Sequence, residues 1–153
     1  MIDKKSKAYL NNLKKNLLKT TKLNIEINKA WNLNFPDAPG VYVFFEKNKI
    51  VYVGETKSIK KRMKDVLRTF NHTLRRKVGE SHFNSNKKYT KATSRLKYHP
   101  DIEVMVNDWF VNKMKMCFLP VSLGRKELEE MMNHEDNPKY NSNTRRGNQV
   151  WKD

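Results

Sequence analysis

A short hairpin between two glycines is the feature that most constrains how this chain can fold. Residues 41–46 and 50–53 are rich in β-branched and aromatic side chains, which is the composition typical of strands. The three polar residues 47–49 between them leave room only for a tight turn, so the two strands are expected to pair antiparallel. Gly40 and Gly54 stand at the outer ends, where we expect their backbone freedom to be used.

The segments around the hairpin indicate a fold with both helices and strands. Apolar residues recur at helical spacing, with polar residues between them, in several segments. We expect helices over residues 5–20, 58–70, 100–112 and 125–133, and a further helical turn or two over 72–78. A third strand is expected over 115–121. The predicted fold class is therefore α+β, with a small, three-stranded, mostly antiparallel sheet flanked by helices, and its first two strands at 40–46 and 50–54.

The excess of positive charge points to a polyanionic partner. The chain has 153 residues, enough for one domain, and its 32 Lys and Arg against 16 Asp and Glu give a net charge of +16. Such a charge suits nucleic acid, with an acidic membrane surface as the alternative. The single Cys117 excludes an intramolecular disulfide and a cysteine-rich zinc site. No apolar run follows Met1 or approaches the length of a membrane span, so we expect a cytoplasmic protein with no membrane partner.

Two segments carry most of this charge. Residues 1–35 hold eight lysines against two acids, and we interpret them as a basic helical N-terminal extension to a domain over 36–153. Residues 68–97 hold nine lysines or arginines against Glu80 alone. Basic side chains attract phosphate but do not read a sequence by themselves. We expect the following side chains to contact nucleic acid: Lys60, Lys61, Lys64, Arg68, Arg75, Arg76, Lys87, Lys88, Lys91 and Arg95.

Two tyrosines and an arginine follow one another at equal intervals. Tyr52 lies ten residues after Tyr42, and Arg62 lies ten residues after Tyr52. Each tyrosine is flanked by valines, so alternation along a strand turns both rings to the face opposite those valines, and in a hairpin of this length they can share one face. Taken singly, these are ordinary residues, because strands favour tyrosine and an arginine on a helix is normally a solvated charge.

Residues further along the chain complete a pattern. The chain resembles the GIY-YIG nuclease superfamily, in particular the GIY-YIG domain of the bacterial excision-repair nuclease subunit, through these pieces: Pro39-Gly40-Val41-Tyr42, Tyr52-Val53-Gly54, Lys61-Arg62, Leu128-Glu129, Pro138 and Asn141. The resemblance covers about residues 39–141. We take Glu129 rather than its neighbouring carboxylates because its offset to Pro138 and Asn141 fits. Alone, Glu129 would be a solvent-exposed helix carboxylate, and Asn141 a turn residue.

The resemblance implies a metal-dependent DNA endonuclease and a role for each site residue. Tyr42 would be the general base that acts on water, and Tyr52 would position the water or the scissile phosphate. Arg62 would pair with a phosphate oxygen. Glu129 would hold one divalent ion, Mg²⁺ or Mn²⁺, and Asn141 would brace the site or the loop after the last helix. Because a free phenol titrates near pH 10, Tyr42 needs a lowered pKa or a proton acceptor.

The chain departs from the family pattern in two ways. The family has a tyrosine or histidine one turn after its arginine, where this chain has Val66. His72 is the candidate to replace that residue, and the alternative is that His72 is a surface histidine on a basic helix. Glu129 lies 67 residues after Arg62, which is longer than the compact family pattern requires. We interpret the basic segment 68–97 as an insertion.

Two other function classes remain open. The chain could be a non-catalytic nucleic-acid-binding module on a GIY-YIG scaffold, as the valine in place of a proton-transferring residue suggests. It could also be a structural protein on a polyanion such as rRNA, in which case the tyrosine pair is a coincidence. Within the nuclease interpretation, the sequence leaves open a restriction, repair or mobile-element role. It also leaves open whether the protein forms a homodimer or uses a specificity partner.

Overall fold

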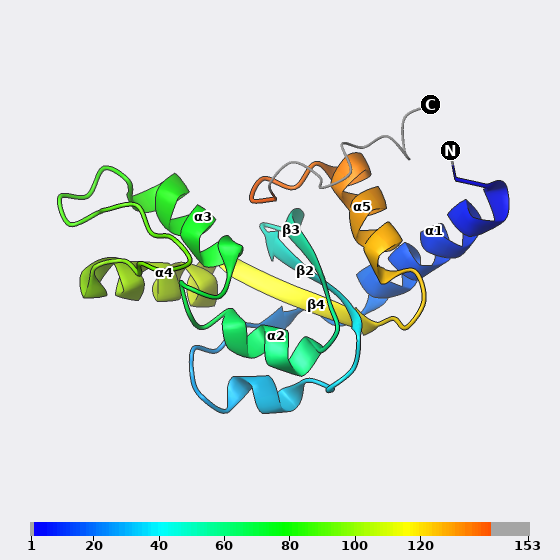
Figure 1. Cartoon of the computed structure of the whole chain (residues 1–153), viewed down its shortest axis with the longest axis horizontal. Helices are drawn as coiled ribbons and strands as arrows, with labels where there is room; N and C mark the ends of the chain where they lie inside the picture. Colours follow the sequence, from blue (N-terminus) through cyan, green and yellow to red (C-terminus); the bar gives the residue numbers. More distant parts are fainter. Residues whose placement is uncertain (1, 142–153) are drawn as a thin grey trace.

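The predicted hairpin forms and lies at one side of a four-stranded antiparallel sheet. The computed structural model describes residues 2–141 (Figure 1). Its strands are β1 (Leu23–Asn24), β2 (Gly40–Glu46), β3 (Lys49–Thr56) and β4 (Met114–Pro120). They lie in the order β1-β4-β2-β3, and every pairing is antiparallel. The predicted α+β class is confirmed. The strand that the sequence missed is β1, which is too short to carry an alternating pattern.

The turn of the hairpin has two residues rather than three. Lys47 and Asn48 both have positive φ, at 49° and 63°, as a tight turn between right-twisted strands requires. Lys49 already pairs with Glu46. Tyr42 pairs with Gly54, two residue pairs from the outer end of the hairpin, and with Phe118 of β4 on its other side.

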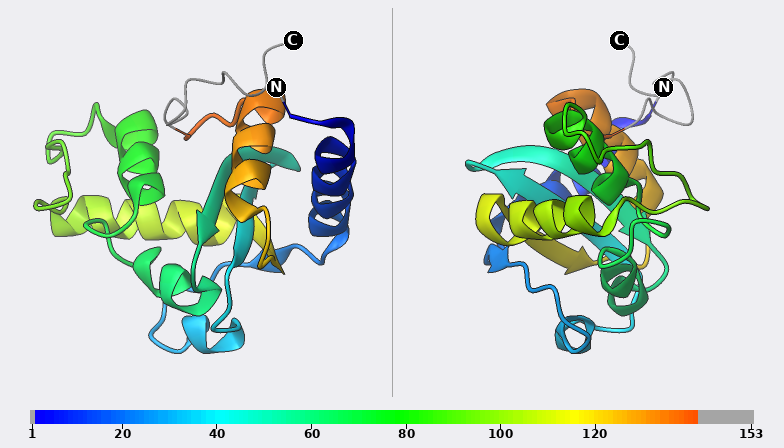
Figure 2. Two further views of the ribbon diagram at one scale, coloured as in Figure 1. Left: turned by 45° about the vertical axis from the view of Figure 1, so that its right-hand side comes forward. Right: turned by 90° about the vertical axis from the view of Figure 1, so that its left-hand side faces the viewer.

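The two faces of the sheet carry separate apolar clusters. Helices α2 (Ile59–Asp65), α3 (Thr73–Phe83) and α4 (Pro100–Lys113) lie on one side, with the 3₁₀ helix η1 (Trp31–Asn34) beside α2. Helices α1 (Lys4–Lys19) and α5 (Arg125–Asp136) lie on the other, as two further views show (Figure 2). Tyr42 and Tyr52 belong to the first cluster, whereas Val41, Val43 and Val53 belong to the second. The two tyrosine rings therefore do share one face.

The N-terminal helix packs as part of the same body as the sheet. Leu10 and Leu17 of α1 are at most 2% exposed and lie in one cluster with Leu128 of α5 and with Cys117 of β4. Burial raises the pKa of the Cys117 thiol, so this cysteine is an inert core residue. No helix within residues 2–141 is both long and apolar enough to cross a membrane.

The helix after the hairpin ends earlier than the sequence predicts. The prediction ran to Phe70, but α2 ends at Asp65 and Val66 caps it. The chain then turns through short backbone bonds, from Arg68 N to Asp65 O at 3.0 Å and from Asn71 N to Arg68 O at 3.1 Å. Phe70, the last residue of that predicted helix, is 37% exposed because the turn carries it off the helix axis. The turn leads directly into α3, which is longer than the predicted turn or two.

Candidate active site

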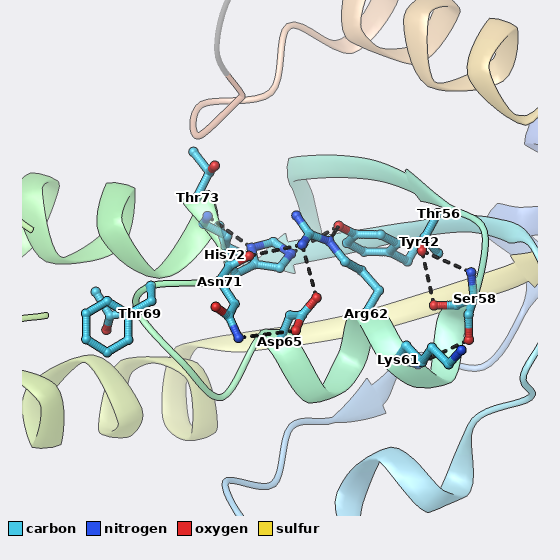
Figure 3. Close-up of polar contacts among 12 residues, drawn as sticks. Tyr42, Thr56, Ser58, Lys61, Arg62, Asp65, Thr69, Asn71, His72 and Thr73 are labelled. Carbon is cyan, nitrogen blue, oxygen red and sulfur yellow. Dashed lines mark hydrogen bonds and ion pairs between the residues drawn. The ribbon is translucent and has the colours of Figure 1, made fainter. Parts of the chain in front are cut away.

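Side chains from three elements meet at the hydroxyl of Tyr42 (Figure 3). Arg62 of α2 donates from Nε to Tyr42 Oη at 3.2 Å. His72, the residue that caps α3, lies with Nε2 3.0 Å from the same oxygen. Tyr52 completes the group, with its ring centroid 6.1 Å from that of Tyr42 and 5.4 Å from that of His72. The structure thus brings together four residues that the sequence placed in the site.

The hydrogen bonds of His72 fix its tautomer. The backbone N–H of Leu74 donates to His72 Nδ1 at 3.1 Å, so Nδ1 carries no proton. Burial lowers the pKa of His72 well below 6.5, and the charges of Arg62, Arg76 and Arg75 lower it further. The ring is therefore neutral with its proton on Nε2, and it donates to Tyr42 Oη. His72 is a donor to the tyrosine, not a base that takes its proton.

Two N–H donors thus converge on the Tyr42 oxygen in a buried setting. Burial raises the pKa of Tyr42 well above 10, and the neighbouring Tyr52 raises it further, whereas Arg62 acts in the opposite direction. Both donors favour the phenolate over the phenol, because each stabilises negative charge on the oxygen. The site therefore holds a phenol whose ionisation is opposed by burial and aided by two well-placed hydrogen bonds.

Glu129 of α5 lies near the second tyrosine. Burial raises the pKa of Tyr52, Arg62 lowers it, and the Glu129 carboxylate raises it, so this carboxylate lies within electrostatic reach of the Tyr52 hydroxyl. Within residues 2–141 there is no cluster of three or more His, Cys, Asp or Glu that would bind a metal through protein ligands alone. A single half-buried carboxylate fits Mg²⁺, which keeps several waters and accepts few protein ligands.

Asn141 lies beside the site as a partner of the outer strand. Its Oδ1 accepts from Val53 N at 2.9 Å and its Nδ2 donates to Val53 O at 2.8 Å. Tyr140 adds a backbone bond to Val51 O at 2.9 Å. The side-chain amide therefore pairs with β3 as a neighbouring strand would, one residue away from Tyr52.

The hairpin glycines serve a purpose other than the one expected. Within residues 2–141, the one glycine with positive φ is Gly124, so neither Gly40 nor Gly54 uses the left-handed region. A Cβ at Gly54 would overlap the ring and hydroxyl of Tyr42, and one at Gly40 would overlap Ile59 and the Leu119 carbonyl. Both glycines are needed for space. The Tyr52-Val53-Gly54 motif singles out Gly54 in the sequence. It does not show that this glycine makes room for Tyr42.

The segment that delivers His72 is tied down along its length. Arg62 Nη1 donates to Asn71 O at 3.0 Å, and Arg76 Nη1 donates to the carbonyls of Thr69 and Phe70, both at 2.9 Å. The Thr69 hydroxyl lies 2.6 and 2.7 Å from the two Glu103 oxygens of α4. This turn places His72 against Tyr42, whereas Val66 is fully buried in the core.

One of the expected nucleic-acid contacts is corrected by this packing. Arg75 is 1% exposed and pairs with Glu103 at 2.7 Å, so it cannot reach a phosphate. Arg76 is partly exposed, and its guanidinium donates to the Thr69 and Phe70 carbonyls and to the Thr73 hydroxyl. Lys88 is exposed and pairs with Asp101. The remaining expected side chains are at least partly exposed: Lys60, Lys61, Lys64, Arg68, Lys87, Lys91 and Arg95.

The chain matches one family of proteins and is similar to several solved structures. The chain matches the family described as the GIY-YIG catalytic domain over residues 39–149. It is similar to the magnesium-bound crystal structure of the GIY-YIG N-terminal endonuclease domain of UvrC from Thermotoga maritima, at 19% identity and a TM-score of 0.41, over 76% of this chain and 96% of that one. A point mutant of the same domain matches at 17% identity and a TM-score of 0.40, over 72% and 90%. No curated protein matches the chain. The family match spans more than half of the sequence, and the chain therefore belongs to the GIY-YIG catalytic domain family, a nuclease superfamily.

Proposed function

We propose that this protein is a metal-dependent endonuclease that hydrolyses DNA phosphodiester bonds. The observation that carries the proposal is the pair of N–H donors, from Arg62 and His72, on the Tyr42 hydroxyl. A tyrosine oxygen has two lone pairs, and both an arginine and a histidine N–H are directed at this one. Two donors on the oxygen stabilise a phenolate, which is the form that a general base requires.

Each residue of the site has a task that its contacts support. Tyr42, once ionised, takes a proton from the attacking water. Arg62 donates from Nε to Tyr42. Its Nη1 donates to the Asn71 carbonyl at 3.0 Å and to Asp65 at 3.3 Å. We assign the remaining group, Nη2, to pair with a phosphate oxygen. A divalent cation held by Glu129 would supply positive charge against the phosphate and the leaving oxygen.

His72 holds the tyrosine and does not move its proton. Its Nδ1 is occupied by the Leu74 amide, so it has no free acceptor for a proton from Tyr42. The proton that Tyr42 must lose before each attack therefore passes to a group other than His72. This makes His72 a positioning residue in place of the missing tyrosine or histidine at Val66.

A second function is favoured by one observation. Burial holds the pKa of Tyr42 well above 10, so only a small fraction is ionised near pH 7. A non-catalytic nucleic-acid-binding module on the same scaffold fits that observation. It would bind DNA with a steep salt dependence and would not cut it.

The test compares Glu129→Gln with Glu127→Gln, a matched change of charge on the same helix. Purified variants and wild type are incubated with supercoiled plasmid and with single-stranded DNA in Mg²⁺, Mn²⁺ and EDTA. We expect metal-dependent nicking or linearisation by the wild type and Glu127→Gln, and none by Glu129→Gln. If a plasmid is linearised in one binding event, without a nicked intermediate, the result would support a dimer that cuts both strands. Binding without cutting under all metal conditions would favour the binding module.

A further inference from the structure

A hollow lies beside α2. It has a volume of about 610 Å³ and lies between the segment around η1 and the end of α2. Figure 1 shows η1, the light-blue helix below the sheet, directly beside α2. The hollow therefore joins the N-terminal extension to the helix that carries Arg62.

The lining of this hollow combines positive charge with an apolar floor. Lys29, Lys64 and Arg68 line it, and all three are exposed. No acidic residue is among its lining residues. Ile27 and Leu67 line it as well, and both pack against the core cluster, so they form a fixed apolar surface.

The rim adds two groups suited to a base. Leu33 is 66% exposed and offers an apolar surface at the rim, and Asn32 places an amide next to it. Phosphate alone would be satisfied by the cations. An unpaired nucleotide offers both an anion and a large flat apolar face, and it is the ligand that uses every part of this lining.

The location ties the hollow to the scissile phosphate. Successive residues of a helix turn by about 100°, so Lys64 lies about 200° round α2 from Arg62. The two side chains thus leave opposite flanks of one helix, about 10 Å apart, or about three nucleotides of duplex rise. A DNA strand that crosses α2 would contact Arg62 on one flank and the hollow on the other.

We propose that this hollow is a subsite for an unpaired nucleotide of the DNA strand, about three nucleotides from the cut. The proposal rests on the proposed DNA endonuclease function for its substrate. Lys29, Lys64 and Arg68 hold backbone phosphates, and the base lies on Ile27, Leu67 and Leu33. The basic N-terminal extension and the start of the basic insertion thus act together as one strand-binding surface.

The test measures DNA binding in EDTA, so that it does not depend on cutting. Fluorescence anisotropy with a labelled single-stranded oligonucleotide compares the triple variant Lys29→Gln, Lys64→Gln, Arg68→Gln with a control triple variant of equal charge. The control changes Lys22, Lys113 and Lys115 to glutamine, three residues that line another basic hollow near the turn of the hairpin. We expect the first variant to lower the slope of log K against log salt by about 2, and the control by less than 1.

A second measurement tests the base. Oligonucleotides with one abasic residue at successive positions are bound to wild type and to Leu33→Ala, a change at an exposed site. We expect one position to weaken wild-type binding several-fold and the Leu33→Ala variant to lose that position dependence.

The outcomes separate this proposal from the nuclease itself. Equal slopes for the two triple variants, or no position dependence, would overturn the subsite. If the triple variant of Lys29, Lys64 and Arg68 loses binding but the wild type never cuts DNA, the subsite would stand and the proposed nuclease activity would be overturned. No binding by the wild type would overturn both.

Discussion

The phenol of Tyr42 lies directly against Gly54 on the neighbouring strand, and the space for its hydroxyl exists only because residue 54 has no side chain. Tyr42 is 1% exposed and cannot withdraw toward solvent. The position of the proposed general base is therefore set by a glycine that has no side chain of its own to contribute to the chemistry.

Gly54→Ala should consequently cost more activity than stability. We expect the methyl group to displace Tyr42 Oη from Arg62 and His72 and to lower the cleavage rate about 100-fold. Overpacking should lower the free energy of unfolding by about 1–3 kcal/mol. Gly124→Ala is the control, because its φ of 89° makes the change destabilising while the site is untouched. Cleavage rates and urea denaturation of both variants check this, and equal rates for the two would contradict it.

His72→Asn separates the two hydrogen bonds of the histidine. Asparagine can still cap α3 by accepting from Leu74 N, but it is too short to donate to Tyr42. Loss of one donor to a charged oxygen should lower the rate about 10- to 100-fold, and His72→Ala should cost about 1 kcal/mol more in unfolding free energy than His72→Asn. His134→Asn, an exposed change on α5, is the control. An undiminished rate in His72→Asn would show that the contact has no role.

The Arg75–Glu103 pair should respond asymmetrically to its two partners. Arg75 is 1% exposed, whereas the Glu103 side chain is 22% exposed and also accepts from Thr69 and from Tyr98 N. Glu103→Ala leaves a buried guanidinium without its counter-charge and should cost about 3 kcal/mol. Arg75→Met leaves a carboxylate that water can reach, and we expect a cost of about 1 kcal/mol. Urea denaturation measures both, and equal costs would argue against this account.

Stability should fall on the acid side of neutrality because of His72. Its pKa is lowered in the folded state by burial, so below about pH 6.5 the unfolded chain binds a proton that the folded chain does not. The free energy of unfolding should then decrease with falling pH, by up to about 1.4 kcal/mol per pH unit for this group, and should not depend on it above pH 6.5. Urea denaturation at several pH values tests this, and His72→Asn should remove that part of the dependence.

The cleavage rate should rise with pH across the neutral range. Burial holds the pKa of Tyr42 well above 10, so the ionised fraction grows about tenfold per pH unit well below that value. We expect the logarithm of the rate to rise between pH 6 and pH 9 without a break near 6.5. A break near 6.5 that disappears in His72→Asn would instead make His72 a proton-transferring group.

The sequence could predict those parts of the site that local patterns determine. The shared face of Tyr42 and Tyr52 follows from alternation along two strands, and the position of Arg62 follows from a capped helix after the hairpin. The path of residues 66–72 could not be predicted, because that turn depends on contacts with α4. Arg75 shows the same limit, since its neighbours suggest a surface and its burial depends on Glu103, 28 residues away.

The pairing of Asn141 and Tyr140 with β3 has a consequence beyond the site. β3 is an edge strand, and an edge with free backbone groups is a template on which strands of other molecules can grow. A single amide side chain and one backbone bond occupy that edge at Val51 and Val53. The opposite edge is formed by a strand of only two residues. We therefore expect Asn141, which pairs with the tyrosine hairpin, also to hinder the pairing of this edge with a strand of another molecule.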